Sequence, residues 1–134
     1  MNFAVTVRVY IEDTDAGGIV YYVNYLKFME RARTEFMRAL GYGKTAIFSD
    51  DKMFVVHSAN VQYLGAARLD DELTVTAVPL KVARSNIVFE QCVSRGGEPL
   101  CRGQVRIACV DRGSSRTCAK PDEMCARVRE SSRL

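Results

Sequence analysis

The chain has 134 residues, of which 48% are hydrophobic and 26% are charged, and 19 basic against 16 acidic residues give a net charge of +3. This length fits one domain, and this composition excludes disordered, collagenous and coiled-coil classes. Much of the positive excess lies between Arg112 and Arg133, so the sequence does not indicate a nucleic-acid-binding face. It contains neither a run that approaches the roughly 20 apolar residues of a transmembrane segment nor a signal-peptide pattern, so we expect a cytoplasmic protein.

Two periodic segments begin the chain. Residues 3–11 alternate apolar and polar side chains, which is the period of a β-strand. From Asn24 to Gly41 the apolar residues recur every three to four positions, which predicts a helix with these two residues as its N-cap and C-cap. Its predicted apolar stripe includes Leu26 and Met29.

Strand-like runs dominate the rest of the sequence. After a polar connection over 41–52 they cover residues 53–64, 72–83, 86–94 and 100–110. One long helix followed by consecutive strands predicts an α+β fold with a mostly antiparallel sheet of about five strands. A single helix covers only one face of such a sheet, and the strands carry apolar residues on both faces, so we expect a homo-oligomer.

The domain occupies residues 1–120 in this interpretation, and residues 121–134 form a basic tail or a short helix. The five cysteines, at positions 92, 101, 109, 118 and 125, include no CxxC pair, so neither a zinc site nor a disulfide framework is indicated and we expect reduced thiols. A two-residue turn at Gly96-Gly97 would nevertheless place Cys92 directly opposite Cys101, where a disulfide is geometrically allowed.

The segment DTDAGG, residues 13–18, joins the first strand to the helix and resembles the start of a calcium loop. Gly17 and Asn24 stand at positions 5 and 12 of that loop, which leaves too few oxygen ligands, and we expect no metal site. The common phosphate-binding glycine motifs are also absent from the sequence. The single histidine, His57, lies in a strand-like run without a nucleophile motif, so acid–base chemistry falls on a carboxylate.

Two interpretations of this segment remain open. In the first, Asp15 lies beside the start of the helix near Tyr22, where unpaired N–H groups could stabilise an oxyanion, as in an acyl-transfer site. In the second, Asp13, Thr14 and Asp15 are turn residues that accept backbone hydrogen bonds, and the glycines only reverse the chain.

The residues D-T-D-A-G-G-I-V-Y-Y-V-N-Y, with the following E-R-A-R-T-E-F, resemble the active-site segment of the hot-dog-fold 4-hydroxybenzoyl-CoA thioesterase family. Within that family the likeness is greatest to the Tol-Pal-associated acyl-CoA thioesterases. It continues through FVVHSANVQYLGAARLDDELTVTA and on to about Pro121. The resemblance implies a hot-dog fold, in which an antiparallel sheet wraps one long helix and subunits join edge to edge as dimers or tetramers.

The same resemblance implies hydrolysis of an acyl-CoA to a free acid and CoA. It gives Asp15 the role of nucleophile or general base, and the backbone N–H of Tyr22 a place in the oxyanion hole. Tol-Pal-associated members commonly have histidine at that second position, so only a backbone role is carried over. Lys81, Arg84 and Ser85 lie where family members bind CoA, although an ordinary solvated strand end is an equally good interpretation of these residues. CoA is part of the substrate, so no cofactor is expected.

Two other functions remain open. One is a hot-dog dehydratase or hydratase acting on acyl carrier thioesters, but that chemistry uses a histidine with a distant carboxylate and only His57 is available. The other is a non-catalytic acyl-CoA-binding or scaffold protein in which Asp15 is purely structural. Hydrolysis of acyl-CoA would separate these functions.

Overall fold

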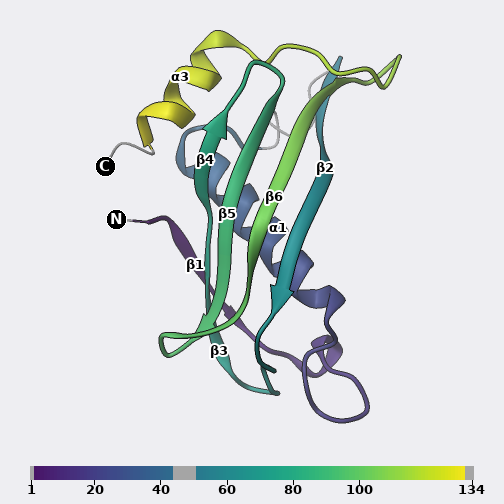
Figure 1. The fold of residues 1–134 in the computed structure, drawn as a ribbon, viewed down its shortest axis with the longest axis vertical. Helices are drawn as coiled ribbons and strands as arrows, with labels where there is room; N and C mark the ends of the chain where they lie inside the picture. The colour runs from purple at the N-terminus through teal and green to yellow at the C-terminus, as the bar shows by residue number, and fades with distance from the viewer. Residues whose placement is uncertain (1, 44–50, 132–134) are drawn as a thin grey trace.

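The computed structural model describes residues 2–43 and 51–131 (Figure 1). Most of the predicted polar connection, residues 44–50, lies outside the described part. In chain order the elements are β1 (Ala4–Arg8), a 3₁₀ turn η1 (Ile11–Asp13), α1 (Val23–Ala39), β2 (Lys52–Tyr63), β3 (Glu72–Thr76), β4 (Val78–Val82), β5 (Asn86–Arg95), β6 (Glu98–Asp111) and α3 (Asp122–Ser131). Over these two ranges, no helix has the length and apolar character needed to cross a membrane.

The strands form one antiparallel sheet in the order β1-β3-β5-β6-β2, and β4 pairs with β5 beyond the end of β3. Figure 1 shows α1 lying against one face of this sheet, with β2 and β1 at opposite edges. This is the predicted α+β hot-dog arrangement, although the sheet has six strands rather than about five.

The extra strand arises because the predicted strand over 72–83 is divided at Ala77. The N–H of Ala77 donates to the carbonyl of Phe3, 3.0 Å away, on the β1 side. The N–H of Cys92 on β5 donates instead to the side-chain hydroxyl of Thr76, 2.9 Å away. The backbone therefore bends between β3, which lies between two strands, and β4, which pairs with β5 alone.

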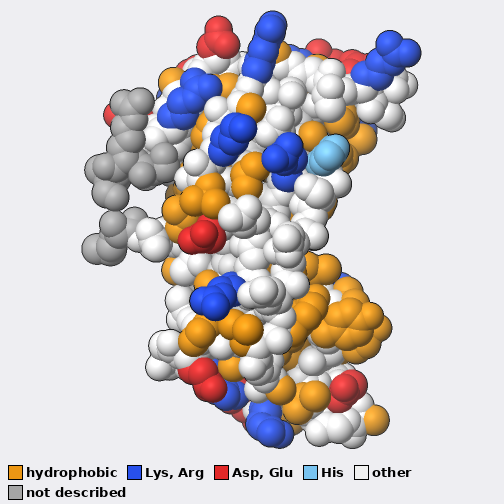
Figure 2. Space-filling view, viewed as in Figure 1, with side chains coloured by type: hydrophobic (Ala, Val, Ile, Leu, Met, Phe, Trp, Pro, Cys, Tyr) orange, Lys and Arg blue, Asp and Glu red, His pale blue; other side chains and the backbone are white. Residues whose placement is uncertain are grey.

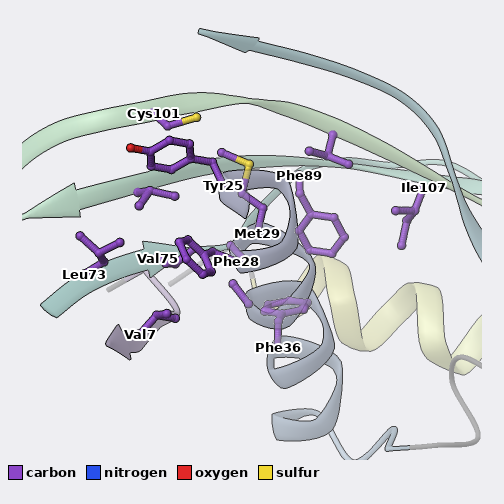
Figure 3. Close-up of a cluster of buried hydrophobic side chains, with 14 of the residues drawn as sticks. Val7, Tyr25, Phe28, Met29, Phe36, Leu73, Val75, Phe89, Cys101 and Ile107 are labelled. Atoms are coloured by element: carbon purple, nitrogen blue, oxygen red, sulfur yellow. The ribbon is translucent and has the colours of Figure 1, made fainter. Parts of the chain in front are cut away.

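The core lies between α1 and the inner face of the sheet (Figure 3). Phe28 and Met29 are fully buried, and the ring of Phe36 meets that of Phe89 edge-to-face with centroids 5.4 Å apart. The prediction that Leu26 belongs to this stripe is wrong, since it is 37% exposed. The buried face instead includes Tyr25, which lies three and four residues before Phe28 and Met29.

The two ends of α1 differ in how well the sequence predicted them. Leu40 is the C-cap rather than Gly41, which follows it directly. Gly41 has a φ of +96°, the left-handed conformation expected of a glycine just after the end of a helix. Asn24 is not the N-cap, because Tyr22 has that position and the helix starts at Val23. The side chain of Asn24 is buried and donates a hydrogen bond to the carboxylate of Asp13, before the helix.

Gln91 of β5 is a fully buried polar residue that joins the helix to the sheet. Its side-chain nitrogen donates to the carbonyl oxygens of Met29 and Thr76, at 2.9 and 3.1 Å. Its side-chain oxygen accepts a 2.9 Å hydrogen bond from the guanidinium of Arg33, whose pKa is lowered by burial. This network holds α1 at the place where β3 ends.

The β5–β6 hairpin corrects the cysteine prediction. Gly96 and Gly97 do form its turn, with φ of +55° and +88°. A β-bulge then shifts the register by one residue, so that Cys92 lies opposite Arg102 and not opposite Cys101. Both thiols are free, and Cys101 is buried in the core.

The predicted short C-terminal helix is present as α3, which Figure 1 shows beside β4. It buries Met124, Cys125 and Val128. The guanidinium of Arg127 donates to the carbonyl of Leu40 at the end of α1, 3.0 Å away. The tail is therefore packed on the sheet and on α1 at the end of the molecule where β4 turns into β5.

Candidate functional site

The segment between β1 and α1 folds into a small hairpin, residues 13–21, which we call the crossing hairpin. Its two sides pair through the N–H of Asp15 donating to the carbonyl of Ile19, 2.9 Å away, and the N–H of Tyr21 donating to that of Asp13, 3.0 Å away. Gly18 at its tip has a φ of +80°, a conformation that favours glycine. The glycines thus close a tight reversal just before the helix.

Asp13 anchors the crossing hairpin. Its carboxylate is 5% exposed and accepts hydrogen bonds from the N–H of Tyr10 and the side-chain amide of Asn24, both at 2.9 Å. Both oxygens accept hydrogen bonds from this chain, so Asp13 has the role that the turn interpretation predicts for it. The buried pair fixes the direction in which the chain enters α1.

Asp15 has a different environment at the tip of the hairpin. Its side chain is exposed, and one carboxylate oxygen accepts a 2.8 Å hydrogen bond from the N–H of Gly17. A Cβ at position 17 would lie 3.3 Å from that oxygen, so glycine leaves the carboxylate room. The carboxylate can therefore accept a further hydrogen bond from a ligand or a water molecule.

Tyr22 stands at the start of α1, where the first N–H groups of a helix lack partners within the helix. Its ring is 57% exposed and packs against the rings of Tyr21 and Tyr63, with centroid distances of 5.0 and 5.8 Å. Asp15 and Tyr22 lie toward opposite ends of the crossing hairpin. Asp15 is at the tip of this hairpin, and Tyr22 is the first residue after its second side.

The connection from β2 to β3 supports the crossing hairpin. The N–H of Val20 donates to the carbonyl of Ala67, 2.8 Å away, and the N–H of Ala67 donates to the hydroxyl of Tyr25, 2.9 Å away. Burial raises the pKa of that phenol, which keeps it protonated. An ion pair of 2.8 Å between Asp71 and Arg95 holds the far side of the connection.

The three residues predicted to bind CoA lie on and after β4. Lys81 is exposed on β4, while Arg84 and Ser85 form a two-residue turn closed by the N–H of Ala83 donating to the carbonyl of Asn86 at 2.9 Å. Figure 2 shows Lys and Arg side chains gathered over this half of the sheet's outer face. The structure brings the three residues to one end of the molecule.

Arg106 belongs to the same basic surface, and the sequence interpretation missed it. Val88 of β5 lies opposite Lys81 on one side and opposite Arg106 of β6 on the other, so all three side chains point to the outer face. Alternation along β6 puts Arg102, Gln104 and Arg106 on this face, but only the strand register places Arg106 in the row of Lys81.

Within one chain, Asp15 lies at the opposite end of the sheet from the turn at Arg84 and Ser85, which we call the basic turn. The crossing hairpin bonds to the segment after Tyr63, at the end of β2, whereas the β4–β5 turn lies beside the start of β2 (Figure 1). The ten residues of β5 span this separation, which corresponds to about 30 Å at the usual rise per residue. One chain alone therefore does not bring the predicted catalytic and CoA-binding residues together.

A cavity of about 300 Å³ opens between α1 and the first half of β2. Its walls are mainly apolar and include Met37, Phe54, Val56 and Ile107. Val56 is 53% exposed. An apolar cavity bordered by an edge strand is a suitable place for an acyl group.

A family profile described as the thioesterase superfamily matches residues 17–102. The chain is 42% identical over 124 residues to the acyl-CoA thioesterase YbgC of Haemophilus influenzae, an alignment that covers 92% of this chain and 91% of that protein. The chain belongs to the thioesterase superfamily. It is also 36% identical over 125 residues to the acyl-CoA thioester hydrolase YbgC of Escherichia coli O6:H1, with 92% of this chain and 93% of that protein covered.

Among solved structures of thioesterases, a probable thioesterase from Bartonella henselae superposes with a TM-score of 0.83 at 28% identity, covering 90% of this chain and 100% of that chain. Membership of the superfamily confirms the resemblance that the crossing segment and the following helix suggested, and with it the hot-dog fold. The roles of Asp15, Tyr22, Lys81, Arg84 and Ser85 stay predictions.

Proposed function

We propose that the protein hydrolyses the thioester of an acyl-CoA to a free acid and CoA. The observation that carries this proposal is the identity of 36–42% with YbgC acyl-CoA thioesterases across nine-tenths of the chain. The arrangement of the crossing hairpin supports it, since the carboxylate of Asp13 is buried and accepts two hydrogen bonds within the chain, while that of Asp15 is exposed at the tip of the hairpin that leads into α1.

In this mechanism Asp15 either attacks the thioester carbonyl, giving an acyl anhydride, or removes a proton from a water molecule that attacks it. The backbone N–H of Tyr22 stabilises the resulting oxyanion, helped by the positive end of the helix dipole. The thiolate of CoA is a good leaving group, so the reaction needs no histidine to protonate it. Within one chain, His57 is exposed in the middle of β2 and lies outside the crossing hairpin.

The proposed active form is an oligomer joined through the β2 edges of two copies. β2 is a 12-residue edge strand, and an exposed edge of this length is suited to pairing with another strand. Antiparallel pairing about a two-fold axis sets the end of one β2 beside the start of the other. The crossing hairpin of one copy would then approach the apolar cavity and the basic turn of its partner.

This pairing supports a shared site, because Asp15 and the predicted CoA-binding residues, about 30 Å apart within one chain, would come together across the two subunits. Asp15 of one subunit would face an acyl group held between α1 and β2 of the other, with the CoA phosphates near Lys81, Arg84 and Ser85. The soluble pool of acyl-CoA would be the substrate source, and a cytoplasmic location fits that role.

The direct test is incubation of the purified, reduced protein with a panel of acyl-CoAs of different chain length and aromaticity, with CoA release measured by chromatography. Hydrolysis of at least one member is the expected result. Binding of acyl-CoA in calorimetry without any release would favour the non-catalytic alternative. Hydration of an enoyl thioester without hydrolysis would favour the dehydratase or hydratase alternative.

A further inference from the structure

Cys109 and Cys118 form a close pair outside the candidate site. Cys109 lies near the end of β6, and the chain returns along that strand after a turn at residues 112–115. The N–H of Cys118 donates to the carbonyl of Cys109 at 2.9 Å, and Val110 and Thr117 form an antiparallel bridge directly beside them. The two sulfur atoms are 3.4 Å apart, and both thiols are free.

The backbone geometry of this pair suits a disulfide. Directly opposed residues of antiparallel strands have Cα atoms about 4.5–5.5 Å apart, within the range of about 4.4–6.8 Å found for disulfides. The sulfur atoms would have to approach from 3.4 Å to about 2.05 Å. A rotation of the Cys118 side chain, which is only partly buried, can supply that movement.

The surroundings distinguish the two thiols. Cys109 is 2% exposed, and burial followed by the contact with Cys118 raises its pKa to about 11. Lys52 and Lys120 lie near it and act in the opposite direction. The ammonium of Lys52 donates to the carbonyl of Ala119, 3.2 Å away, directly after Cys118. Cys118 is therefore the thiol that a dissolved oxidant reaches first, and Cys109 is placed to attack it afterwards.

We propose that Cys109 and Cys118 are a redox modification site, in which a hydroperoxide oxidises the pair to a reversible intramolecular disulfide. The sulfur of Cys118 attacks the O–O bond of the hydroperoxide, forms an S–O bond and releases water or an alcohol. The sulfur of Cys109 then attacks that of Cys118, the S–S bond forms and the S–O bond breaks. The oxygen leaves as water with the proton of Cys109, so two thiols supply the two electrons that reduce the peroxide.

The disulfide would link residues 116–118, which pair with the end of β6, covalently to that strand beside the basic turn. The N–H of Cys109 donates to the carbonyl of Ser85 at 2.8 Å, and the N–H of Lys120 donates to that of Arg84 at 2.9 Å. Oxidation therefore closes a short loop against the end of the sheet where β4 turns into β5. Since a cross-link restricts the unfolded chain, the oxidised protein should melt at a temperature higher by roughly 5 °C.

The test treats the full-length, reduced protein with a small excess of hydrogen peroxide and then counts free thiols in denaturant. The count should fall from five to three, with a monomeric mass lower by two hydrogen atoms, and dithiothreitol should restore it. Proteolysis and mass spectrometry should find one linked pair of peptides, containing Cys109 and Cys118. Cys118→Ser should abolish both the link and the rise in melting temperature.

Cys92→Ser is the matched control, because Cys92 is also partly buried but lies on the outer face of β5 opposite Arg102. This variant should still form the link. Peroxide treatment that leaves five thiols, links other cysteines or joins two chains would overturn the proposal. So would a Cys118→Ser protein that forms an intramolecular disulfide as readily as the unchanged chain.

Discussion

The side-chain amide of Asn24 donates a 2.9 Å hydrogen bond to the buried carboxylate of Asp13, and this bond joins the first turn of α1 to the base of the crossing hairpin. The other oxygen of Asp13 accepts from the N–H of Tyr10. A carboxylate satisfied in this way holds the local structure. Asp15, two residues further on, remains exposed at the tip with room for another partner.

Asp15→Asn should therefore preserve the fold and lower turnover of an acyl-CoA substrate by roughly two to four orders of magnitude, the range for loss of a positioned base. The loss should be larger if Asp15 is the nucleophile. The amide keeps the size of the side chain and can still accept from Gly17, but it has neither the charge nor the basicity. Steady-state hydrolysis at matched folded concentration is the measurement.

Asp13→Asn is the control for that experiment. It replaces a buried acceptor of two hydrogen bonds by a group that has only one acceptor oxygen, so it should lower the melting temperature. An Asp15→Asn protein that keeps more than about a tenth of the turnover would contradict the catalytic role. The crossing hairpin would then be a turn whose carboxylates only accept backbone hydrogen bonds.

Features fixed by local chemistry were predictable from the sequence. The alternation in β1, the glycine at the end of α1 and the Gly96-Gly97 turn each depend on a few neighbouring residues, and the structure confirms all three. The bulge that moves Cys92 away from Cys101 was not predictable, because it depends on how two strands pack in the sheet. The division of the strand at Ala77 has the same origin.

The candidate site was predictable to a similar degree. The contrast between Asp13 and Asp15 follows from the turn and the helix start, both of which are local. Lys81 and Arg106 are 25 residues apart in the sequence. Only the register of β4, β5 and β6 places them in one row. The separation of Asp15 from this row could be found only from the folded chain.

Lys81→Ala combined with Arg84→Ala should raise the KM for acyl-CoA more than it lowers kcat. Both side chains are exposed at the end of the sheet far from Asp15, where contacts to CoA phosphates would bind the ground state and the transition state alike. Steady-state kinetics at low and at high salt give both constants. An unchanged KM would place the phosphate site elsewhere.

The protein should be at least a dimer, and Val56→Lys should convert it to monomers with little activity. Val56 is 53% exposed on the edge strand β2 and borders the apolar cavity, and an edge lysine opposes strand pairing. Light scattering with parallel activity measurements tests both parts.

Leu80→Lys is the matched control, because Leu80 is 51% exposed on β4, away from the β2 edge. It should leave the oligomer intact. A wild-type chain that scatters as a stable 15.0 kDa species at micromolar concentration would contradict the proposed shared site.

Gly103→Ala should destabilise the fold severely, by about 3 kcal/mol or more. A Cβ at this position of β6 would lie 2.2 Å from the carbonyl oxygen of Asn60 and 2.8 Å from the Cα of Val61. These are backbone atoms of the paired strand β2, so they cannot move aside without breaking the ladder. Denaturant unfolding measures the loss, and Gly43→Ala, whose added Cβ meets nothing within 4 Å, should be nearly neutral.

Asp71→Asn should lower the melting temperature at neutral pH, and its effect should disappear in acid. The pKa of Asp71 is lowered, first by the hydrogen bond from Arg95 and then by that from the N–H of Arg68. A carboxyl whose pKa is lower in the folded state contributes stability above its unfolded pKa of about 3.9 and loses it as the pH falls through the folded value. Thermal melts of both proteins from pH 7 to pH 3 should therefore show a difference in melting temperature that is constant down to about pH 4 and then narrows.

Glu98→Gln is the control, because it removes the more exposed partner of the same arginine. It should lower the melting temperature by less than Asp71→Asn at pH 7. If the difference in melting temperature for Asp71→Asn is the same at every pH, the charge of Asp71 does not stabilise the connection from β2 to β3.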